Sequence, residues 1–276
     1  IIYGDIFDVC DKMPKCSVDL LIADPPYNLN KKYGKTDFKK MNEDEYKAFT
    51  NDWICLVKPL LKDHASIYIC CDWKSSLAVS SVLQEHFTIQ NRITWQREKG
   101  RGAKRNWKNA MEDIWFATLS PKNYTFNLEN VKMRRRVLAP YKENGKPKDW
   151  TAGRDGSFRD TYPSNFWDDI SIPYWSMPEN TDHPTQKPEK LMAKLILASS
   201  NPDDMVFDPF VGSGTTAVTA KKLDRHFVGV ESEGLYCALA QKRLEMAEKD
   251  KKIQGYTDGI FWERNTLAAQ LKYKNH

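Results

Sequence analysis

Residues 18–27 read VDLLIADPPY, and this stretch decides how the chain folds. The run from Val18 to Ala23 is almost entirely apolar, which is typical of a parallel strand buried on both faces. Two prolines then end the strand, because proline has no N–H to donate to a neighbouring strand. Asp24 and Tyr27 are therefore expected at the carboxyl end of a buried strand, where open α/β sheets bind ligands. The simpler alternative is a strand-end turn with a surface tyrosine.

Segments typical of strands and helices alternate along most of the 276 residues. This alternation predicts an α/β fold with a doubly wound, mostly parallel sheet, built as one domain over residues 1–276. Asn42 is expected to cap one helix, with Glu45 at the capping-box position. Further strands are expected at residues 66–70, 88–95, 112–119 and 226–230, and helices at residues 75–86 and 234–247. Residues 248–276 form a C-terminal extension to which the sequence assigns no role.

Composition narrows the class of protein. Hydrophobic residues make up 41% of the chain, enough for one large domain or one domain with an insert. No apolar run approaches the roughly 20 residues that a membrane-spanning helix needs. The six cysteines show neither a CxxC pair nor a zinc spacing. Reduced thiols in a cytosolic protein are therefore expected, and a metal site is not.

The alternation breaks between residues 97 and 180, and residues 160–180 are expected to be irregular. Residues 97–154 contain 15 Lys or Arg and six Asp or Glu, a net charge of +9, which leaves −4 for the rest of the chain. Basic residues interleaved with aromatic residues and glycines are typical of a nucleic-acid surface, and a solvated, loop-rich insert is the alternative. The basic residues expected to bind the polyanion from this insert are Arg101, Lys104, Arg105, Arg134, Arg135 and Arg136.

A second basic segment, residues 28–40, carries five lysines around Gly34 and has no apolar period. It is expected to form a mobile loop. The loop is either simply solvated or closes over substrate phosphates, which Lys31 and Lys32 would bind.

The stretch MVFDPFVGSGTT at residues 205–216 predicts a strand, a glycine turn and the start of a helix. Its glycines let a ligand approach the backbone beside the helix N-terminus. The turn lacks the third glycine of a dinucleotide fingerprint and the Gly-Lys-Ser/Thr of a P-loop. The next strand ends in Glu231, and an acid at this place commonly holds ribose hydroxyls. These features favour a cofactor that contains a nucleoside and no pyrophosphate.

Taken in order, the motifs resemble those of DNA amino-methyltransferases that use S-adenosylmethionine. The tetrapeptide at 24–27 comes first, a variable region follows, and HPTQKP at 183–188 and the glycine motif at 208–214 come last. This order is similar to the permuted β class of bacterial N6-adenine methyltransferases, which includes restriction-modification enzymes of the MboIIA and RsrI type. The resemblance implies a circularly permuted, Rossmann-like class I methyltransferase fold. It also implies that residues 97–180 contain an irregular target-recognition insert.

The resemblance implies a role for each residue that matches a family motif. The catalytic turn would comprise Asp24, Pro25, Pro26 and Tyr27. S-adenosylmethionine would be bound by Asp5, Asp24, His183, Thr185, Lys187, Asp208, Pro209, Phe210, Gly212, Ser213, Gly214, Thr215 and Glu231. In this assignment the residues from the HPTQKP motif border the methionine carboxylate of the cofactor.

These residue types suit the transfer of a methyl group to an exocyclic amine. Such an amine is a poor nucleophile because its lone pair is delocalised into the ring. The Asp24 carboxylate and the Pro25 carbonyl can accept its two N–H groups, which stabilises the charge that develops on nitrogen. The base must first leave the duplex. Tyr27 then offers a ring for stacking, typically worth about 1–3 kcal/mol per base.

Asp24 favours adenine as the target, because the family's cytosine-N4 members more often carry serine at this position. Two alternatives stay open at this point: an amino-methyltransferase for N4 of cytosine in DNA or for an RNA base, and a non-catalytic subunit that binds cofactor and DNA. The resemblance implies double-stranded DNA as the partner, and neither a membrane nor a metal. It is compatible with a homodimer and a cognate restriction endonuclease, in the cytoplasm of a bacterium or encoded by a phage.

Overall fold

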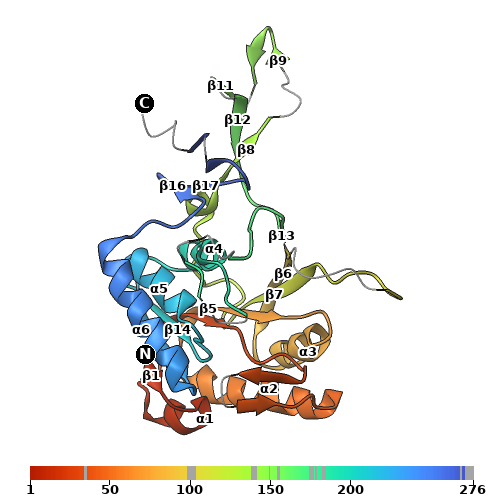
Figure 1. Ribbon diagram of the computed structural model, residues 1–276, viewed down its shortest axis with the longest axis vertical. Coiled ribbons are helices and arrows are strands. Elements are labelled where there is room, and N and C mark those ends of the chain that lie inside the picture. Colours follow the sequence, from red (N-terminus) through yellow and green to blue (C-terminus); the bar gives the residue numbers. More distant parts are fainter. Residues whose placement is uncertain are drawn as a thin grey trace.

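The computed structural model describes residues 1–270 except 34–35, 98–103, 138–141, 149, 154–155, 174–176, 178, 182–184 and 268. Within these residues the chain forms an α/β body from which a smaller β-sheet projects (Figure 1). None of the described helices is both long and apolar enough to cross a membrane.

The described main sheet has eight strands. Their order across the sheet is β1 (Ile2–Tyr3), β15 (His226–Glu231), β14 (Met205–Asp208), β2 (Val18–Ala23), β5 (Leu61–Cys71), β7 (Met111–Thr118), β6 (Thr88–Gln96) and β13 (Phe166–Trp167). All neighbours are parallel except β5–β7 and β6–β7, which are antiparallel. All six residues of β2 are buried, because helices cover both faces of the sheet at its centre.

Helices lie on both faces of this sheet, as the prediction of a doubly wound α/β fold requires. They are α1 (Ile6–Val9), α2 (Glu43–Val57), α3 (Ser76–His86), α4 (Glu189–Ser199), α5 (Thr215–Lys222) and α6 (Gly234–Lys249), with short 3₁₀ turns at Cys10–Lys12, Lys58–Leu60 and Leu128–Val131. One core joins α2 and α3 to the side chains of Leu21, Ile67 and Cys71, and a second joins α4 to the opposite side chains of Leu20 and Cys70. Successive strand residues face opposite sides, so each helix layer packs on its own set. The predicted fold class is confirmed.

Side-chain caps set where α1 and α2 begin, and the cap of α2 is the one that the sequence predicts. Asp5 caps α1 by accepting a hydrogen bond from the Phe7 N–H at 3.0 Å. Asn42 and Glu45 form the expected capping box at α2, with distances of 2.9 Å in both directions. A capping box satisfies N–H groups that have no partner inside the helix, and it therefore sets where the helix starts.

The smaller sheet joins the insert to the C-terminal extension. Its order is β11 (Thr151–Gly153), β12 (Gly156–Thr161), β8 (Met133–Arg136), β17 (Ile260–Trp262) and β16 (Tyr256–Thr257), and a separate hairpin pairs β9 (Lys142–Glu143) with β10 (Lys146–Pro147). Phe261 and Trp262 are buried, and Phe261 belongs to a core that includes Met133 and residues of α4. Strand β17 of the extension therefore helps to pack this sheet against α4 of the body.

The expectation of irregular structure over residues 160–180 is wrong in part. β12 extends to Thr161, and β13 adds Phe166 and Trp167 to the edge of the main sheet beside β6. The Trp167 indole N–H donates to the Ser164 carbonyl at 2.9 Å, and the ring is buried. Two-residue strands leave no period in a sequence, which is why the pattern did not predict them.

Residues 28–40, expected to form a loop, instead contain the antiparallel hairpin β3 (Lys31–Tyr33) and β4 (Thr36–Phe38). Asparagine side chains close its base: the Asn30 Oδ1 accepts from the Lys40 N–H at 2.8 Å. Phe38 packs edge-on against Phe49 of α2, with ring centroids 5.7 Å apart. Lysine-rich strands have weak intrinsic β-propensity, so these tertiary contacts decide the conformation.

Candidate active site

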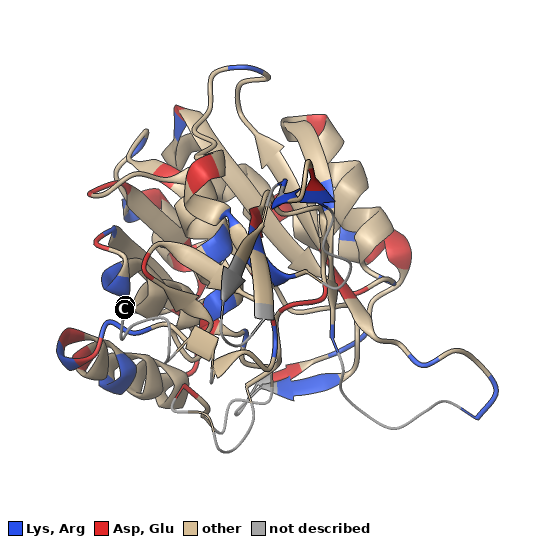
Figure 2. Ribbon diagram, turned by 90° about the horizontal axis from the view of Figure 1, so that it is seen from above, with Lys and Arg blue, Asp and Glu red and all other residues tan. Residues whose placement is uncertain are grey.

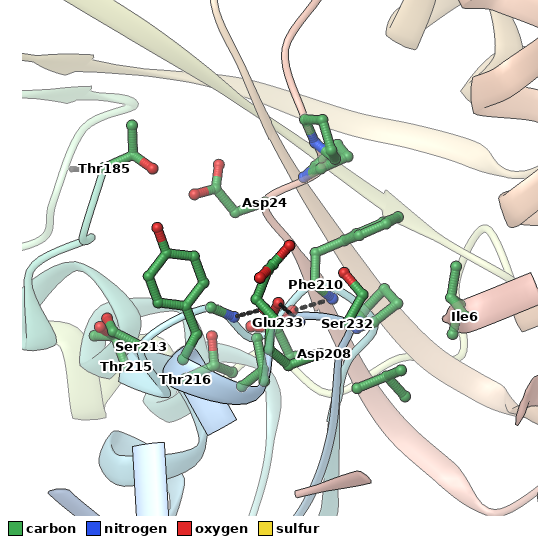
Figure 3. Close-up of a pocket in the computed structure, with 18 of the residues that line it drawn as sticks. Ile6, Asp24, Thr185, Asp208, Phe210, Ser213, Thr215, Thr216, Ser232 and Glu233 are labelled. Atoms are coloured by element: carbon green, nitrogen blue, oxygen red, sulfur yellow. Dashed lines mark hydrogen bonds between the residues drawn. The ribbon is translucent and has the colours of Figure 1, made fainter. Parts of the chain in front are cut away.

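A cavity of about 250 Å³ lies at the carboxyl edge of the main sheet, where β2, β14 and β15 end. Most of the predicted site residues line it: Asp5, Asp24, Pro25, Pro26, Tyr27, Thr185, Lys187, Asp208, Pro209, Phe210, Gly212, Ser213, Thr215 and Glu231. Figure 3 shows Asp24 and Thr185 on one side of the cavity and Ile6 on the other. His183 lies outside the described residues.

The turn that follows β2 is held by the helices on one face of the sheet. The Tyr46 hydroxyl of α2 donates to the Pro26 carbonyl at 3.0 Å. The Asn28 N–H donates to Ser75 Oγ at 3.2 Å, and the Asn28 side chain exchanges two hydrogen bonds with the backbone of Met41. Because the turn is fixed on both sides, Asp24 and Tyr27 keep a constant place at the cavity.

Asp24 is bound by two groups at once. The Tyr27 hydroxyl donates to Asp24 Oδ1 at 2.9 Å, and the Lys187 ammonium lies 2.6 Å from Asp24 Oδ2. Lys187 Nζ also donates to the Tyr27 hydroxyl at 3.0 Å and lies over the tyrosine ring, 5.3 Å from its centroid. The lysine of the HPTQKP motif thus contacts the predicted catalytic acid directly, a contact that sequence reasoning did not foresee.

A second carboxylate, Glu112 of β7, completes this cluster. Its Oε2 lies 3.4 Å from the Tyr27 hydroxyl and 3.5 Å from Lys187 Nζ, and its Oε1 accepts from Arg97. Sequence reasoning missed Glu112, although two acids at the start of an otherwise apolar strand were a visible signal. The antiparallel course of β7 places its first residues at the carboxyl edge of β2 and β5.

The glycine turn connects β14 to α5. Gly212 has φ of 51°, a left-handed conformation that favours glycine, and its N–H donates to Glu231 Oε2 at 2.9 Å. Gly214 is not among the described residues that line the cavity; a Cβ there would lie 2.7 Å from the Ala240 Cβ of α6. Gly212 therefore shapes the cavity wall, whereas Gly214 lets α5 and α6 approach each other.

Buried Arg243 of α6 supports this turn from behind, a role that no motif in the sequence predicts. Its guanidinium donates to the Ser213 carbonyl at 2.9 Å and to the Thr215 hydroxyl at 3.0 Å. It also pairs with Glu189 at the start of α4 at 3.1 Å. The glycine turn and the HPTQKP segment are thus connected through one side chain.

Further residues complete the cavity at its far end. Ser232 and Glu233 follow β15, and both face the cavity with Asp208 and Phe210 (Figure 3). Additional lining residues that sequence reasoning missed are Phe7, Phe38, Phe49 and Tyr236. Acids and aromatic rings therefore line the cavity together.

Burial changes the acid–base properties of the cavity. It raises the pKa of the Asp208 carboxyl to about 7, and the nearby Asp24 and Glu231 carboxylates add to the shift. Burial also raises the pKa of Glu231, although backbone N–H groups oppose the change. A cationic ligand in the cavity would favour the ionised form of both acids.

The basic residues predicted to bind a polyanion fall into three places. Lys31 and Lys32 lie on β3; Lys32 is exposed, whereas burial lowers the pKa of Lys31, with Arg97 and Lys187 nearby. Lys104 and Arg105 are exposed on the segment between β6 and β7, which projects from the body in both views (Figures 1 and 2). Arg101 lies outside the described residues.

The three arginines on β8, Arg134–Arg136, are not equally available to a polyanion, contrary to the expectation from the sequence. Arg134 forms two 2.7 Å hydrogen bonds to Asp160 of β12 and stacks over Trp262, with its side chain only 13% exposed. Such a bidentate pair fixes the guanidinium in the sheet. Arg135 is one-third exposed beside Asp168, and Arg136 is exposed. Only these last two present a side chain that a polyanion could reach readily.

The model of the DNA methylase family matches residues 18–242, which include both motifs and most of the residues that line the cavity. The chain belongs to this family.

Two curated relatives of this DNA methylase cover most of it. The DNA adenine methyltransferase YhdJ of Escherichia coli K12 is 34% identical over 279 residues, which span 97% of this chain and 92% of the relative. The type II methyltransferase M.HpaI of Haemophilus parainfluenzae is 35% identical over 231 residues, 83% of this chain and 68% of the relative. The crystal structure of the M1.HpyAVI–SAM complex superimposes with a TM-score of 0.58 at 27% identity, covering 88% of this chain and 98% of that one.

The methylase thus places an acid and an aromatic ring in the wall of a cavity that the glycine turn also lines. The carboxylate of Asp24 can accept hydrogen bonds from an amine, and the ring of Tyr27 can contact a flat base. The acids along the cavity suit a cation. This arrangement can bring an amine and a cationic ligand together at Asp24.

Proposed function

We propose that this chain transfers a methyl group from S-adenosylmethionine to N6 of an adenine flipped out of double-stranded DNA. The observation that carries the proposal is that Asp24 and Tyr27 line the same cavity as Asp208 and Gly212. A target base at Tyr27 and a donor beside the glycine turn would therefore meet at Asp24.

The residues present fit S-adenosylmethionine. This molecule combines a sulfonium and an amino group with an adenosine, and when bound it supplies an electrophilic methyl group. Carboxylates line the cavity at Asp5, Asp208, Glu231 and Glu233, and rings line it at Phe7, Phe38, Phe49 and Phe210. Carboxylates attract the positive charges, and aromatic rings give a purine apolar faces to contact. The crystal structure of M1.HpyAVI with this cofactor, on the same fold, supports the assignment.

Residues of the HPTQKP segment and of the glycine turn are proposed to surround the methionine part of the cofactor. Thr185 and Ser213 line the cavity on the side of Asp24 (Figure 3). Glu231 also lines the cavity, at the end of β15, and would hold the ribose hydroxyls. His183 is assigned to the same role by its motif alone. Gly214 supports the site indirectly, through the packing of α5 on α6.

The chain's own residues would then activate the amine. Asp24 and the Pro25 carbonyl accept its two N–H groups, so that the nitrogen lone pair turns away from the ring system and toward the methyl group. Tyr27 stacks on the base, and its ring is held in place because the hydroxyl is bound by Asp24 and Lys187. The positive charge that develops on nitrogen is stabilised by the carboxylate.

Adenine is the proposed target for two reasons. Asp24 stands where adenine-N6 enzymes of this class most often carry an acid, and the relative from E. coli is named a DNA adenine methyltransferase. The second candidate is N4 of cytosine, since the same hydrogen-bond acceptors suit any planar exocyclic amine. A cytosine-N4 enzyme, the PvuII methyltransferase, shares the fold with a TM-score of 0.65 at 18% identity.

We assign recognition of the DNA site to the insert within residues 97–180, whose accessible cations are exposed Lys104, Arg105 and Arg136 and one-third exposed Arg135. Lys31 and Lys32 would bind phosphates beside the flipped base. A cognate restriction endonuclease that acts on the same site, and a homodimer in solution, complete the proposal. The type II relative from H. parainfluenzae supports a restriction-modification role. Such a role places the enzyme in the bacterial cytoplasm.

The test is a modified-nucleoside analysis of DNA from cells that express the chain, together with sequencing of the modified positions. N6-methyladenine confined to one short sequence is expected. N4-methylcytosine without N6-methyladenine would exclude the adenine target. Binding of S-adenosylmethionine without methyl transfer to any DNA would instead favour a non-catalytic subunit.

A further inference from the structure

The Asp24 cluster contains a carboxylate that the reaction outlined above does not use. Glu112 is 3% exposed, yet its charge lies among the residues proposed to bind the target amine. Arg97 holds Glu112 Oε1. Glu112 Oε2 faces the Tyr27 hydroxyl and the Lys187 ammonium at 3.4 and 3.5 Å.

The observed contacts create a conflict at Asp24. Both oxygens of this carboxylate are already engaged, Oδ1 by the Tyr27 hydroxyl and Oδ2 by Lys187 at 2.6 Å. An ammonium bound this closely withdraws charge from the carboxylate and makes it a weaker acceptor for a neutral amine. The target amine therefore needs Lys187 to loosen its contact with Asp24.

Lys187 has one other charged acceptor in reach among the described residues, and that acceptor is Glu112. We propose that Glu112 is a positioning residue for the methyl transfer, which receives the Lys187 ammonium when the target amine takes the Asp24 carboxylate. This inference rests on the proposed function and adds to it a lysine that moves between two acids.

The geometry makes the movement short and keeps the charges balanced. Nζ already lies within 3.5 Å of Glu112 Oε2, so a displacement of the order of one ångström forms a hydrogen bond there. The lysine side chain is 6% exposed, so it cannot turn to solvent without leaving its pocket. Burial alone would lower the pKa of Lys187, but the carboxylates of Asp24 and Glu112 outweigh burial and raise the pKa. The ammonium consequently stays charged and follows a carboxylate.

Arg97 stabilises the Glu112 carboxylate while the lysine is bound to Asp24. Its hydrogen bond fixes one carboxylate oxygen and balances the charge of Glu112 while Lys187 is on Asp24. Arg97 follows β6 directly and meets Glu112 of β7 because the two strands are antiparallel, with Trp95 opposite Glu112. Lys104 and Arg105 lie in the same segment between these strands.

The experiment compares Glu112→Gln, Glu112→Asp and the control Asp113→Asn in single-turnover methylation of DNA. Asp113 is the matched control because it is the next residue, is equally buried, and faces the other way, toward Ser76 and Thr94. We expect Glu112→Gln to slow methyl transfer by about 100-fold, the usual effect of a misplaced reacting group. Cofactor affinity and the melting temperature should change little, and Asp113→Asn should remain close to the wild type.

Glu112→Asp separates a role in charge from a role in packing. Glutamine keeps the size of glutamate and loses its charge, whereas aspartate keeps the charge on a shorter side chain. If Glu112 receives an ammonium, aspartate retains more activity than glutamine. The opposite order, or a Glu112→Gln enzyme as fast as the wild type, overturns the proposal.

A double-mutant cycle with Lys187→Met tests the link to the lysine. Once the ammonium is gone, Glu112→Gln should have little further effect, because nothing remains for the carboxylate to receive. An equal loss in both backgrounds refutes the inference. If Glu112→Gln fails to fold, Glu112→Asp is measured in the same two backgrounds with the same criterion. A wild-type chain that methylates no DNA would refute the proposed function as well, whereas an active wild type with additive losses refutes only the role of Glu112.

Discussion

Asp24→Asn is the substitution that tests the proposed chemistry most directly. Asparagine has nearly the same size, so the turn after β2 keeps its shape, but the charge is lost and one oxygen becomes an amide donor. Removing one preorganised group that stabilises transition-state charge typically lowers kcat about 100- to 1000-fold, equivalent to about 2.7–4 kcal/mol. We expect a loss at the upper end of this range. The amide N–H group of asparagine also repels the amine N–H from which the Asp24 carboxylate should accept a hydrogen bond.

The structure also sets the expected effect on stability. Breaking a buried ion pair costs about 3–5 kcal/mol when it leaves a charge without a partner. Here Lys187 keeps Glu112 at 3.5 Å and the Tyr27 hydroxyl at 3.0 Å. The cost of Asp24→Asn should therefore fall to about 1.5–3 kcal/mol, in the range of one lost charged hydrogen bond. The melting temperature should decrease by only a few degrees.

Three measurements separate catalysis from folding. Single-turnover transfer of a labelled methyl group to DNA gives the rate of the chemical step. Calorimetric titration gives the affinity for S-adenosylmethionine, and thermal denaturation gives the stability. An Asp24→Asn enzyme that is folded, binds cofactor and retains a rate within tenfold of the wild type would show that the amine is activated elsewhere.

Three further predictions concern the packing of α5 on α6, the DNA surface and the pH dependence of stability. Gly214→Ala should destabilise the fold by about 2–4 kcal/mol in denaturant titration, because φ is +85° and the new Cβ meets the α6 backbone at 3.0 Å. Gly145→Ala has a similar φ and no atom within 4 Å, so it should cost only about 1 kcal/mol, and equal losses would contradict the packing argument. Replacing Lys104 and Arg105 together with alanine should weaken DNA binding and reduce the slope of log K against log salt by about two, and an unchanged slope would place the DNA elsewhere. Because the pKa of Asp208 is raised to about 7, the folded state retains a proton that the unfolded state loses near pH 4. The free energy of unfolding should therefore decrease between pH 4 and 7, and this group contributes up to about 1.4 kcal/mol per pH unit. Asp208→Asn should flatten this part of the stability profile, and an unaltered profile would mean that Asp208 is ionised throughout.

Local patterns were sufficient for the body of the protein. The alternation of strands and helices, the capping box at Asn42 and the apolar β2 all follow from side-chain period and capping chemistry, which act over a few residues. The hairpin at β3 and β4 and the two-residue strand β13 escaped prediction. Their conformations depend on partners such as Asn30 and β6, which are distant or polar and leave no periodic signal.

The same division holds for the cations of the insert. Charge counting identified a basic region, and residues such as Lys104 and Arg105 are indeed exposed. A count of charges cannot show which cations form ion pairs within the protein. Arg134 is equivalent to its neighbours in the sequence, yet Asp160 and Trp262 occupy its guanidinium once β8, β12 and β17 form one sheet.

Local sequence patterns were enough to predict an acid, two prolines and a tyrosine at the end of a buried strand. They also predicted the glycine turn that meets these residues at the same edge of the sheet. Parallel strands bring their carboxyl ends together, so residues 24–27 and 208–216 had to share a cavity once both were recognised. The groups that surround Asp24, in contrast, are set by tertiary contacts. Glu112 lies 85 residues from Tyr27 in the chain, and it arrives because β7 runs antiparallel to β5, a direction that no local pattern specifies. Strand direction depends on the packing of the whole sheet, and here it converts a short motif into a cluster of two acids, a lysine and an arginine.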